Sequence, residues 1–283
     1  MELLARTRRP TRLSRTGCGK CTRELPKLPM RTIWAVMKHS GALFGRSPWA
    51  RPRIPVGCIL VGKGRAMANQ SILEPGNLLM VQERERLLRR ILEEHDIRSL
   101  EGIRAFEAGC STGYNLRLMV QWGAAPRDQA GQDLSDEAVA YCAAHSDQIR
   151  VHPGSANQIP EPDELFDLSL AFTLFSSVPD EDVAHGIAKE LFRITRPGGL
   201  ILVYDLRRDN PRNATVHKLA DDDLRRWFPS CPMKAHHLTL APPIARPVGR
   251  WAPFLYGPLA ALPPLRTHTL WVLRRPALPL RRD

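Results

Sequence analysis

The feature that most constrains the fold of this chain is a regular alternation of strand and helix patterns between residues 103 and 205. Short apolar runs predict five strands, at 103–108, 130–134, 149–152, 166–175 and 200–205. Helical spacing of apolar residues predicts three helices between them, at 115–122, 136–145 and 180–195. Strands that alternate with helices pair in parallel, because each helix returns the chain to the same end of the sheet.

The rest of the chain extends this pattern. A helical pattern from Gly76 onward precedes the first strand. After the fifth strand we expect a helix at 221–228 and two more strands, at 234–240 and 267–273. The predicted fold is α/β: a doubly wound, mostly parallel seven-stranded sheet with helices on both faces.

Three local signals define helix ends within this pattern. Ser135 is predicted to cap the helix that follows it, because serine side chains accept hydrogen bonds from free helix N–H groups. Two acids begin the helix at 180–195. The turn at 196–199, Arg-Pro-Gly-Gly, is predicted to end that helix, since proline does not continue a helix and glycine allows a left-handed backbone.

The excess positive charge lies in the N-terminal quarter of the chain. Of 41 Lys/Arg and 29 Asp/Glu, residues 1–65 contain fifteen and two, which leaves 26 basic and 27 acidic side chains in the other 218 residues. We expect a disordered basic extension at 1–66, or upstream sequence before a start at Met67, and one folded domain at 67–283. A mitochondrial-type presequence is the alternative, although Pro10 and Gly17 interrupt it.

Cysteine usage favours a cytoplasmic protein without a disulfide framework. The six cysteines are widely dispersed, unlike those of a small secreted scaffold. Cys18 and Cys21 lack a second pair at metal-site spacing, so no metal site is predicted.

A proline-rich insert at 242–265 separates the last two predicted strands. Residues 251–265 carry no charge but contain four prolines, so this run is too short and too broken to cross a bilayer. The insert is apolar enough to cover a pocket for a hydrophobic acceptor, to pack as core or to form a dimer contact, and peripheral membrane contact stays open. Its largest side chains are expected to be core rather than lid: Trp251, Phe254, Leu255 and Tyr256.

The loop after the first strand carries the clearest chemical signal. Gly109 and Gly113 permit a tight turn and a close backbone approach to a ligand, and the following helix offers free N–H donors. Asp133, at the end of the second strand, follows Gly113 by 20 residues, a spacing that suits a carboxylate accepting both hydroxyls of a ribose. Together they predict a nucleoside-containing cofactor at the carboxyl edge of the sheet.

Four segments in order resemble class I S-adenosylmethionine (SAM)-dependent methyltransferases, and the resemblance spans about residues 80–276. They are Glu-Ala-Gly-Cys-Ser-Thr-Gly at 107–113, Gly-Gln-Asp at 131–133, Phe-Asp-Leu-Ser-Leu-Ala-Phe at 166–172 and Arg-Pro-Gly-Gly at 196–199. The resemblance implies a Rossmann-like methyltransferase fold with SAM as cofactor. It implies that Glu107 helps hold the methionine end and that Asp133 binds the ribose. The cofactor-binding residues that follow are Glu107, Gly109, Cys110, Ser111, Gly113, Asp133, Leu134, Ser155, Ala156, Phe172 and Thr173.

Two positions depart from the family pattern. Ser111 replaces the middle glycine of the loop, so we expect that turn to adopt a conformation open to side chains. Ser155 stands where an Asp often bonds the adenine amine, and a serine hydroxyl still offers such a hydrogen bond. A nicotinamide dinucleotide is the rival cofactor, but glycines four positions apart do not match its G-x-G-x-x-G fingerprint.

The acceptor is expected at the same sheet edge, because ligands of open α/β sheets bind beyond the carboxyl ends of the strands. The polar run after the fifth strand supplies Asp205, Arg207 and Asn210, of which Arg207 and Asn210 are predicted to grip the acceptor. Asp205, His217 and His268 are the candidates for a catalytic base.

The preferred function is methyl transfer from SAM to a small-molecule acceptor, hydrophobic or lipid-linked. One alternative is a nucleic-acid methyltransferase that uses the basic extension, which is disfavoured because that extension has few interleaved aromatics. A catalytically silent SAM-binding partner protein is the other. The sequence predicts no oligomeric state.

Overall fold

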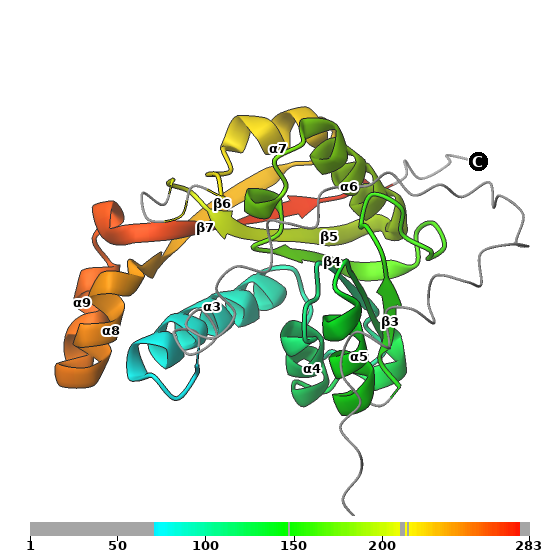
Figure 1. The fold of residues 1–283 in the computed structure, drawn as a ribbon. Helices are drawn as coiled ribbons and strands as arrows, with labels where there is room; N and C mark the ends of the chain where they lie inside the picture. Colours follow the sequence, from blue (N-terminus) through cyan, green and yellow to red (C-terminus); the bar gives the residue numbers. More distant parts are fainter. Residues whose placement is uncertain (1–70, 147, 210–212, 214, 278–283) are drawn as a thin grey trace, which may run out of the picture. The chain divides into compact units, whose positions relative to one another are not determined.

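A seven-stranded sheet organises the residues that the computed structural model describes, which are 71–277 except 147, 210–212 and 214 (Figure 1). The predicted extension at 1–66 and Asn210 lie outside the described residues. The strand order is β3-β2-β1-β4-β5-β7-β6, and only β7 runs antiparallel to its neighbours. The strands are β1 (Ala105–Ala108), β2 (Gln129–Asp133), β3 (Arg150–Pro153), β4 (Phe166–Phe172), β5 (Thr195–Leu206), β6 (Met233–Leu240) and β7 (Arg266–Arg274).

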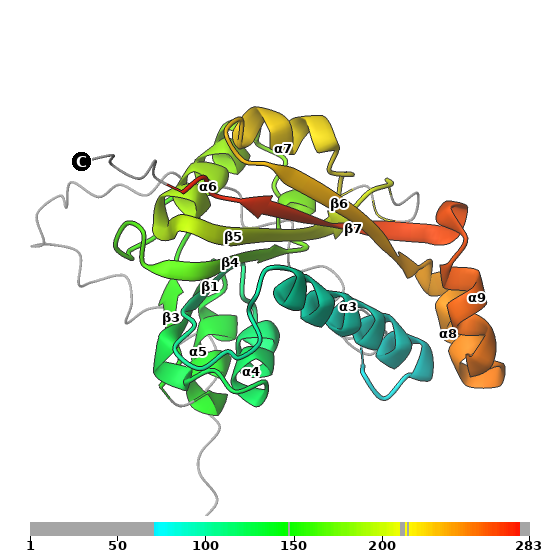
Figure 2. The ribbon, with the colours of Figure 1, turned by 180° about the vertical axis from the view of Figure 1, so that it is seen from behind.

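Helices cover both faces of this sheet, as the two opposite views show (Figures 1 and 2). One face carries α3 (Pro75–Glu94), α4 (Tyr114–Gln121) and α5 (Asp136–His145), and the other carries α6 (Glu181–Ile194) and α7 (Asp221–Trp227). A hydrophobic core lies on each face of the sheet, and strand β5 contributes side chains to both. Leu202 packs with α3 residues on one face and Val203 with α6 residues on the other. The predicted doubly wound, mostly parallel seven-stranded sheet is confirmed.

The local predictions hold in part. Ser135 Oγ accepts the N–H of Ala138 at 3.2 Å, so the predicted cap of α5 is confirmed. The strand predicted at 166–175 ends earlier, at Phe172, because Thr173 adopts a left-handed backbone with φ of +53° and a 3-10 helix, η3 (Phe175–Ser177), follows. The helix ends at Ile194 and Gly198 has a left-handed φ of +79°, as predicted for 196–199, but β5 already begins at Thr195 rather than at Leu200.

The proline-rich insert forms a series of short helices between β6 and β7. It consists of α8 (Pro242–Trp251), η4 (Pro253–Leu255), α9 (Tyr256–Ala260) and η5 (Pro263–Leu265). Of the four side chains expected to be core, only Tyr256 is buried, whereas Trp251 is 80% exposed and Phe254 77%. Leu255 is 41% exposed, so the expectation is wrong for three of the four, which the short helices present on their outer side.

Helices α3 and α8 meet backbone to backbone at two glycines. A β-carbon on Gly249 would lie 2.4 Å from the nitrogen of Gly76, and one on Gly76 would lie 2.3 Å from the carbonyl oxygen of Ala245. No side chain lies between the helices at this crossing, so the glycines set how closely the insert packs on α3.

We predict that Gly249→Ala lowers the free energy of unfolding by about 1–3 kcal/mol, because the added methyl group pushes α8 away from α3. Gly257→Ala on α9 is the matched control, since no atom lies within 4 Å of its added β-carbon. Urea unfolding of both variants tests this. Equal stabilities of the two variants would contradict the close packing.

Candidate active site

The loop between β1 and α4 is built from left-handed backbone. Gly109, Ser111 and Gly113 have φ of +68°, +47° and +76°. The loop is tied to the end of the neighbouring strand, because the N–H groups of Gly109 and Cys110 both donate to the carbonyl oxygen of Gln132, at 2.8 and 3.1 Å. This sharp turn brings the chain from the carboxyl end of β1 directly into α4.

Ser111 corrects one expectation from the sequence. Its backbone lies in the left-handed region, so the turn does not adopt a conformation that is open to side chains. A non-glycine residue there costs about 1–2 kcal/mol. The hydrogen bond from Ser111 N–H to Asp133 Oδ2, 2.7 Å long, offsets part of this cost.

Asp133 joins two loops at the sheet edge. Its Oδ2 accepts from Ser111 and its Oδ1 accepts the N–H of Ser135 at 2.9 Å. Each carboxylate oxygen has a second lone pair, so the group can still accept two further hydrogen bonds. The next residue, Leu134, is 60% exposed and lies at the same edge.

The two glycines meet side chains rather than open space. A β-carbon on Gly113 would lie 2.4 Å from Cys142 Sγ of α5, so this glycine is needed to pack the loop on that helix. One on Gly109 would lie 2.9 Å from Leu174 Cδ1, a side chain just beyond β4. Cys110 is buried and its sulfur faces Gly131 of β2.

Glu107, on β1, is a buried acid whose pKa departs strongly from its ordinary value. It is 2% exposed, and burial raises its pKa to about 8, although the hydrogen bond from Asn115 Nδ2 to its Oε1 (2.5 Å) acts in the opposite direction. Its Oε2 is buried without a hydrogen-bond partner among the described residues. A buried carboxyl oxygen without a partner indicates a place where a ligand donor belongs.

Arg84 of α3 is a site residue that the sequence analysis missed. Its Nη2 donates to Asn115 Oδ1 at 3.2 Å, so the amide of Asn115 bridges Arg84 and Glu107. The guanidinium carbon lies 5.3 Å from the ring centres of both Phe172 and Tyr204. Its Nε is buried without a hydrogen-bond partner in the described part of the chain.

The ends of β3 and β4 bring the remaining predicted cofactor residues to the same edge. Ser155 and Ala156 follow β3, where the carbonyl oxygen of Ser155 accepts from Gln132 Nε2 at 3.1 Å. Phe172 is buried at the end of β4, and Thr173 is exposed beside it. The N–H of Thr173 donates to the carbonyl oxygen of Tyr204 at 2.6 Å, which joins β4 and β5 at their ends.

The predicted acceptor residues differ in what they contact. Asp205 is fully buried and accepts the N–H groups of Ser176 and Leu206, so its carboxyl organises the loop after β4, and burial raises its pKa. Arg207 Nη1 donates to the carbonyl oxygen of Pro263 at 3.2 Å. An acceptor-binding or catalytic role for Asp205 and Arg207 stays a prediction.

The two candidate histidines lie in different surroundings. His217 is exposed, and its N–H donates to the carbonyl oxygen of Ser176 at 2.9 Å. His268 stacks on Tyr204, with ring centres 4.8 Å apart and planes at 6°. Only His268 therefore belongs to the aromatic group around Arg84.

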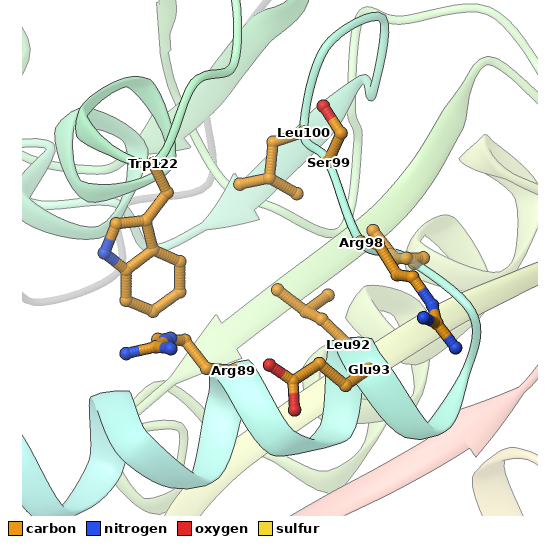
Figure 3. Close-up of a pocket in the computed structure, with 8 residues that line it drawn as sticks. Arg89, Leu92, Glu93, Arg98, Ser99, Leu100 and Trp122 are labelled. Carbon is orange, nitrogen blue, oxygen red and sulfur yellow. The ribbon is translucent and has the colours of Figure 1, made fainter.

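A groove of about 630 Å³ lies elsewhere, between the C-terminal half of α3 and Trp122 (Figure 3). Leu100, which lines it, precedes β1, and Trp122 follows α4, so the groove is at the opposite end of β1 from the glycine loop. It is not part of the candidate site. No group of three or more metal-ligating side chains is found within the described ranges.

Fold and site together define a Rossmann-like protein with a nucleotide-type loop at the carboxyl edge of its sheet. Residues 106–203 match the family model described as a methyltransferase domain. The chain is 29% identical over 114 residues to a probable S-adenosylmethionine-dependent methyltransferase from Mycolicibacterium smegmatis, covering 38% of this chain and 42% of that protein. It is 27% identical over 136 residues to a ubiquinone biosynthesis O-methyltransferase from Rhizobium etli, covering 47% of this chain and 52% of that protein.

The fold is also similar to that of a candidate sarcosine dimethylglycine methyltransferase from Galdieria sulphuraria, with a TM-score of 0.50 and 14% identity over 68% of this chain and 85% of that one. The family match and the similarity to a probable SAM-dependent methyltransferase support a SAM-dependent methyltransferase domain over residues 106–203. The chain spans about half or less of the length of the curated relatives named above.

The residues present fit SAM, whose methionine end carries an ammonium and a carboxylate. Glu107 and Arg84 lie on either side of Asn115, and each has a buried polar atom without a hydrogen-bond partner among the residues that the structure describes. An acceptor oxygen and a donor nitrogen in one buried place match the two charges of an amino acid. Asp133, with its free lone pairs, suits the ribose hydroxyls.

We predict that Ser111→Gly raises the free energy of unfolding by about 0.5–1 kcal/mol, because the relief of left-handed strain exceeds the entropy cost of glycine. Ser155→Gly is the control at a serine without positive φ, and it is expected to lower stability by about 0.4–1 kcal/mol. Urea unfolding measures both. If both variants lose stability equally, Ser111 is not strained.

Proposed function

We propose that this chain transfers a methyl group from SAM to an oxygen of a small hydrophobic acceptor. The cofactor half of this proposal rests on Glu107 Oε2 and Arg84 Nε. Both atoms are buried without a hydrogen-bond partner among the described residues, and both residues bond Asn115. The acceptor half rests on the aromatic surroundings of Arg84 and on the similarity to an O-methyltransferase of ubiquinone biosynthesis.

Glu107, Arg84 and Asp133 would hold the cofactor, and Phe172 would line its reactive end. When bound, SAM supplies an electrophilic methyl group that an acceptor oxygen attacks in line with the departing sulfur. The protein then has two tasks: to exclude water around the reacting atoms and to receive the proton of the acceptor hydroxyl.

His268 is the side chain suited to receive that proton. The hydroxyl of Thr267 donates its proton to the carbonyl oxygen of Thr239 at 3.2 Å. The oxygen of this hydroxyl therefore acts as the acceptor toward His268 Nδ1, which is 2.9 Å away. The proton of the imidazole is therefore on Nδ1, and Nε2 keeps a free lone pair. Stacking on Tyr204 fixes the plane of the ring, and the hydroxyl of Tyr204 is itself bonded to Thr239 Oγ1 at 2.9 Å.

Burial lowers the pKa of His268 to about 4, and the positive charge of Arg84 contributes to this shift as the smaller cause. The imidazole is thus neutral at physiological pH and able to accept a proton. A base of such low pKa holds the proton weakly. We expect it to act in the transfer step and to release the proton to solvent afterwards.

The cofactor assignment predicts that SAM binds with release of a proton. Below about pH 8 the free protein carries a protonated Glu107, whereas the ammonium of SAM favours the ionised carboxylate. SAM affinity should therefore rise with pH toward about 8 and fall above it, where the ammonium of SAM itself loses its proton. Calorimetry at pH 7 in buffers of different ionisation enthalpy should give a release approaching one proton per SAM, and no binding of NAD.

Glu107→Gln is the control for this titration, since the amide keeps the shape of the side chain but cannot titrate. It should bind SAM more weakly and without proton release. A buffer-independent binding enthalpy in the unaltered protein would show that Glu107 is not the titrating group, and NAD binding would refute the cofactor assignment.

The acceptor assignment predicts methylation of 4-alkylcatechols, with kcat/KM rising as the alkyl chain lengthens. His268→Asn should lower kcat by roughly 10²–10⁴-fold while leaving SAM affinity unchanged, because the lost group acts on the acceptor proton. The acid limb of the rate profile of the unaltered protein should have its midpoint near pH 4, not near 6.5. Undiminished turnover by His268→Asn would remove this residue from the mechanism.

A further inference from the structure

The insert exposes an uncharged apolar surface, which we call the apolar tip and define as residues 251–265. Four large side chains on it face solvent: Trp251 (80% exposed), Phe254 (77%), Leu255 (41%) and Leu262 (49%). Single exposed apolar residues are ordinary, but a contiguous group on one segment marks an interaction surface.

The inner side of the tip is already packed, so the exposed residues are not displaced core. Tyr256 and Ala260 are buried with Leu240 and Ala245. The hydroxyl of Tyr256 donates to Glu83 Oε2 of α3 at 2.7 Å. The tip is thereby fixed to α3 and β6, and its outer side chains are held outward.

Arginines flank the tip on both sides. Residues 241–277 contain five arginines and no acid, and two of them, Arg250 and Arg266, stand directly before and after the tip. Arg250 is 3.5 Å from Glu74, and Arg266 donates to the carbonyl oxygens of Ala260 and His237. Bonds to neutral carbonyls leave the charge of Arg266 uncompensated.

A second exposed apolar element adjoins the tip. Leu73, next to Glu74, is 88% exposed just before α3. The start of α3 lies beside α8 (Figures 1 and 2), and the contact of Glu74 with Arg250 joins the segment that contains Leu73 to the residue just before the tip. An exposed leucine thus adjoins the tip from a segment far away in sequence.

Tryptophan, phenylalanine and leucine beside arginine are the residues that seat a protein in a bilayer interface, with the apolar groups among the acyl chains and the cations at anionic headgroups. The described residues include no helix that is long and apolar enough to span a membrane, so the tip would rest on the surface. We propose that the apolar tip, with Arg250 and Arg266, docks on an anionic lipid bilayer.

This docking goes beyond the proposed methyl transfer and does not depend on it. The tip lies between the end of β6 and the start of β7, where His268 also lies. Docking would therefore bring the candidate acceptor side of the sheet edge next to the lipid. An acceptor dissolved in the bilayer would then reach the site without crossing water.

Vesicle binding by the full chain tests the proposal. We use phosphatidylcholine vesicles with and without phosphatidylglycerol at one physiological salt concentration, and every variant keeps the fifteen basic residues of 1–65, so their contribution to binding is the same in each comparison. The unaltered chain should sediment with the anionic vesicles. The double variant Trp251→Ala/Phe254→Ala should bind at least tenfold more weakly, and Arg250→Gln about fivefold. Tyr141→Ala, an exposed aromatic on α5, is the matched control and should bind normally.

Hydrogen exchange with and without vesicles identifies the surface independently of the variants. Anionic vesicles should slow exchange of the amides at 250–266. Unchanged binding of the double variant, or vesicle protection only outside 250–266, overturns the proposal. So does protection of 250–266 that is already complete without lipid, since this indicates a second copy or another part of the chain on the tip. SAM affinity, measured in parallel, reports separately on the cofactor site.

Discussion

The carboxylate of Asp133 is the interaction on which the candidate site depends. It holds Ser111 in a left-handed conformation that serine rarely adopts, and it also receives the N–H of Ser135 at the start of α5. Because β1 and β2 are parallel neighbours, one acid at the end of β2 can organise the loops after both strands. One side chain therefore joins the glycine loop to the start of α5, while the carbonyl oxygen of Gln132 holds the beginning of that loop.

Glu107 and Arg84 lie beside the loop that Asp133 stabilises, and together they form the proposed binding site for the amino-acid end of the cofactor. The carboxyl of Glu107 and the guanidinium of Arg84 bond the same amide, Asn115, and each retains a buried polar atom without a partner in the described part of the chain. Burial of such groups costs free energy that the protein alone does not recover. Burial raises the pKa of Glu107 in the free protein, and under the proposed function a zwitterionic ligand would supply both missing partners.

Much of the fold was predictable because strand and helix periods are local properties of the sequence. Gly113 and Asp133 were found from spacing alone, and both lie at the predicted edge. Arg84 was not predictable, since a lone arginine on an amphipathic helix resembles a solvated residue until α3 packs against β4 and β5. Trp251 and Phe254 were expected to be buried because they are large and apolar. Their exposure becomes evident only from the close packing of α8 on α3, which determines the side of the insert that faces outward.

The amino-acid end of SAM is the proposed centre of recognition, and a comparison of two ligands tests this proposal. Methylthioadenosine has the adenosine and the methylthio group of the cofactor but lacks its ammonium and carboxylate. We predict that calorimetry gives at least a hundredfold weaker binding for methylthioadenosine than for SAM, and that Arg84→Gln removes most of this difference. Equal affinity of the unaltered protein for the two ligands would contradict the role assigned to Glu107 and Arg84.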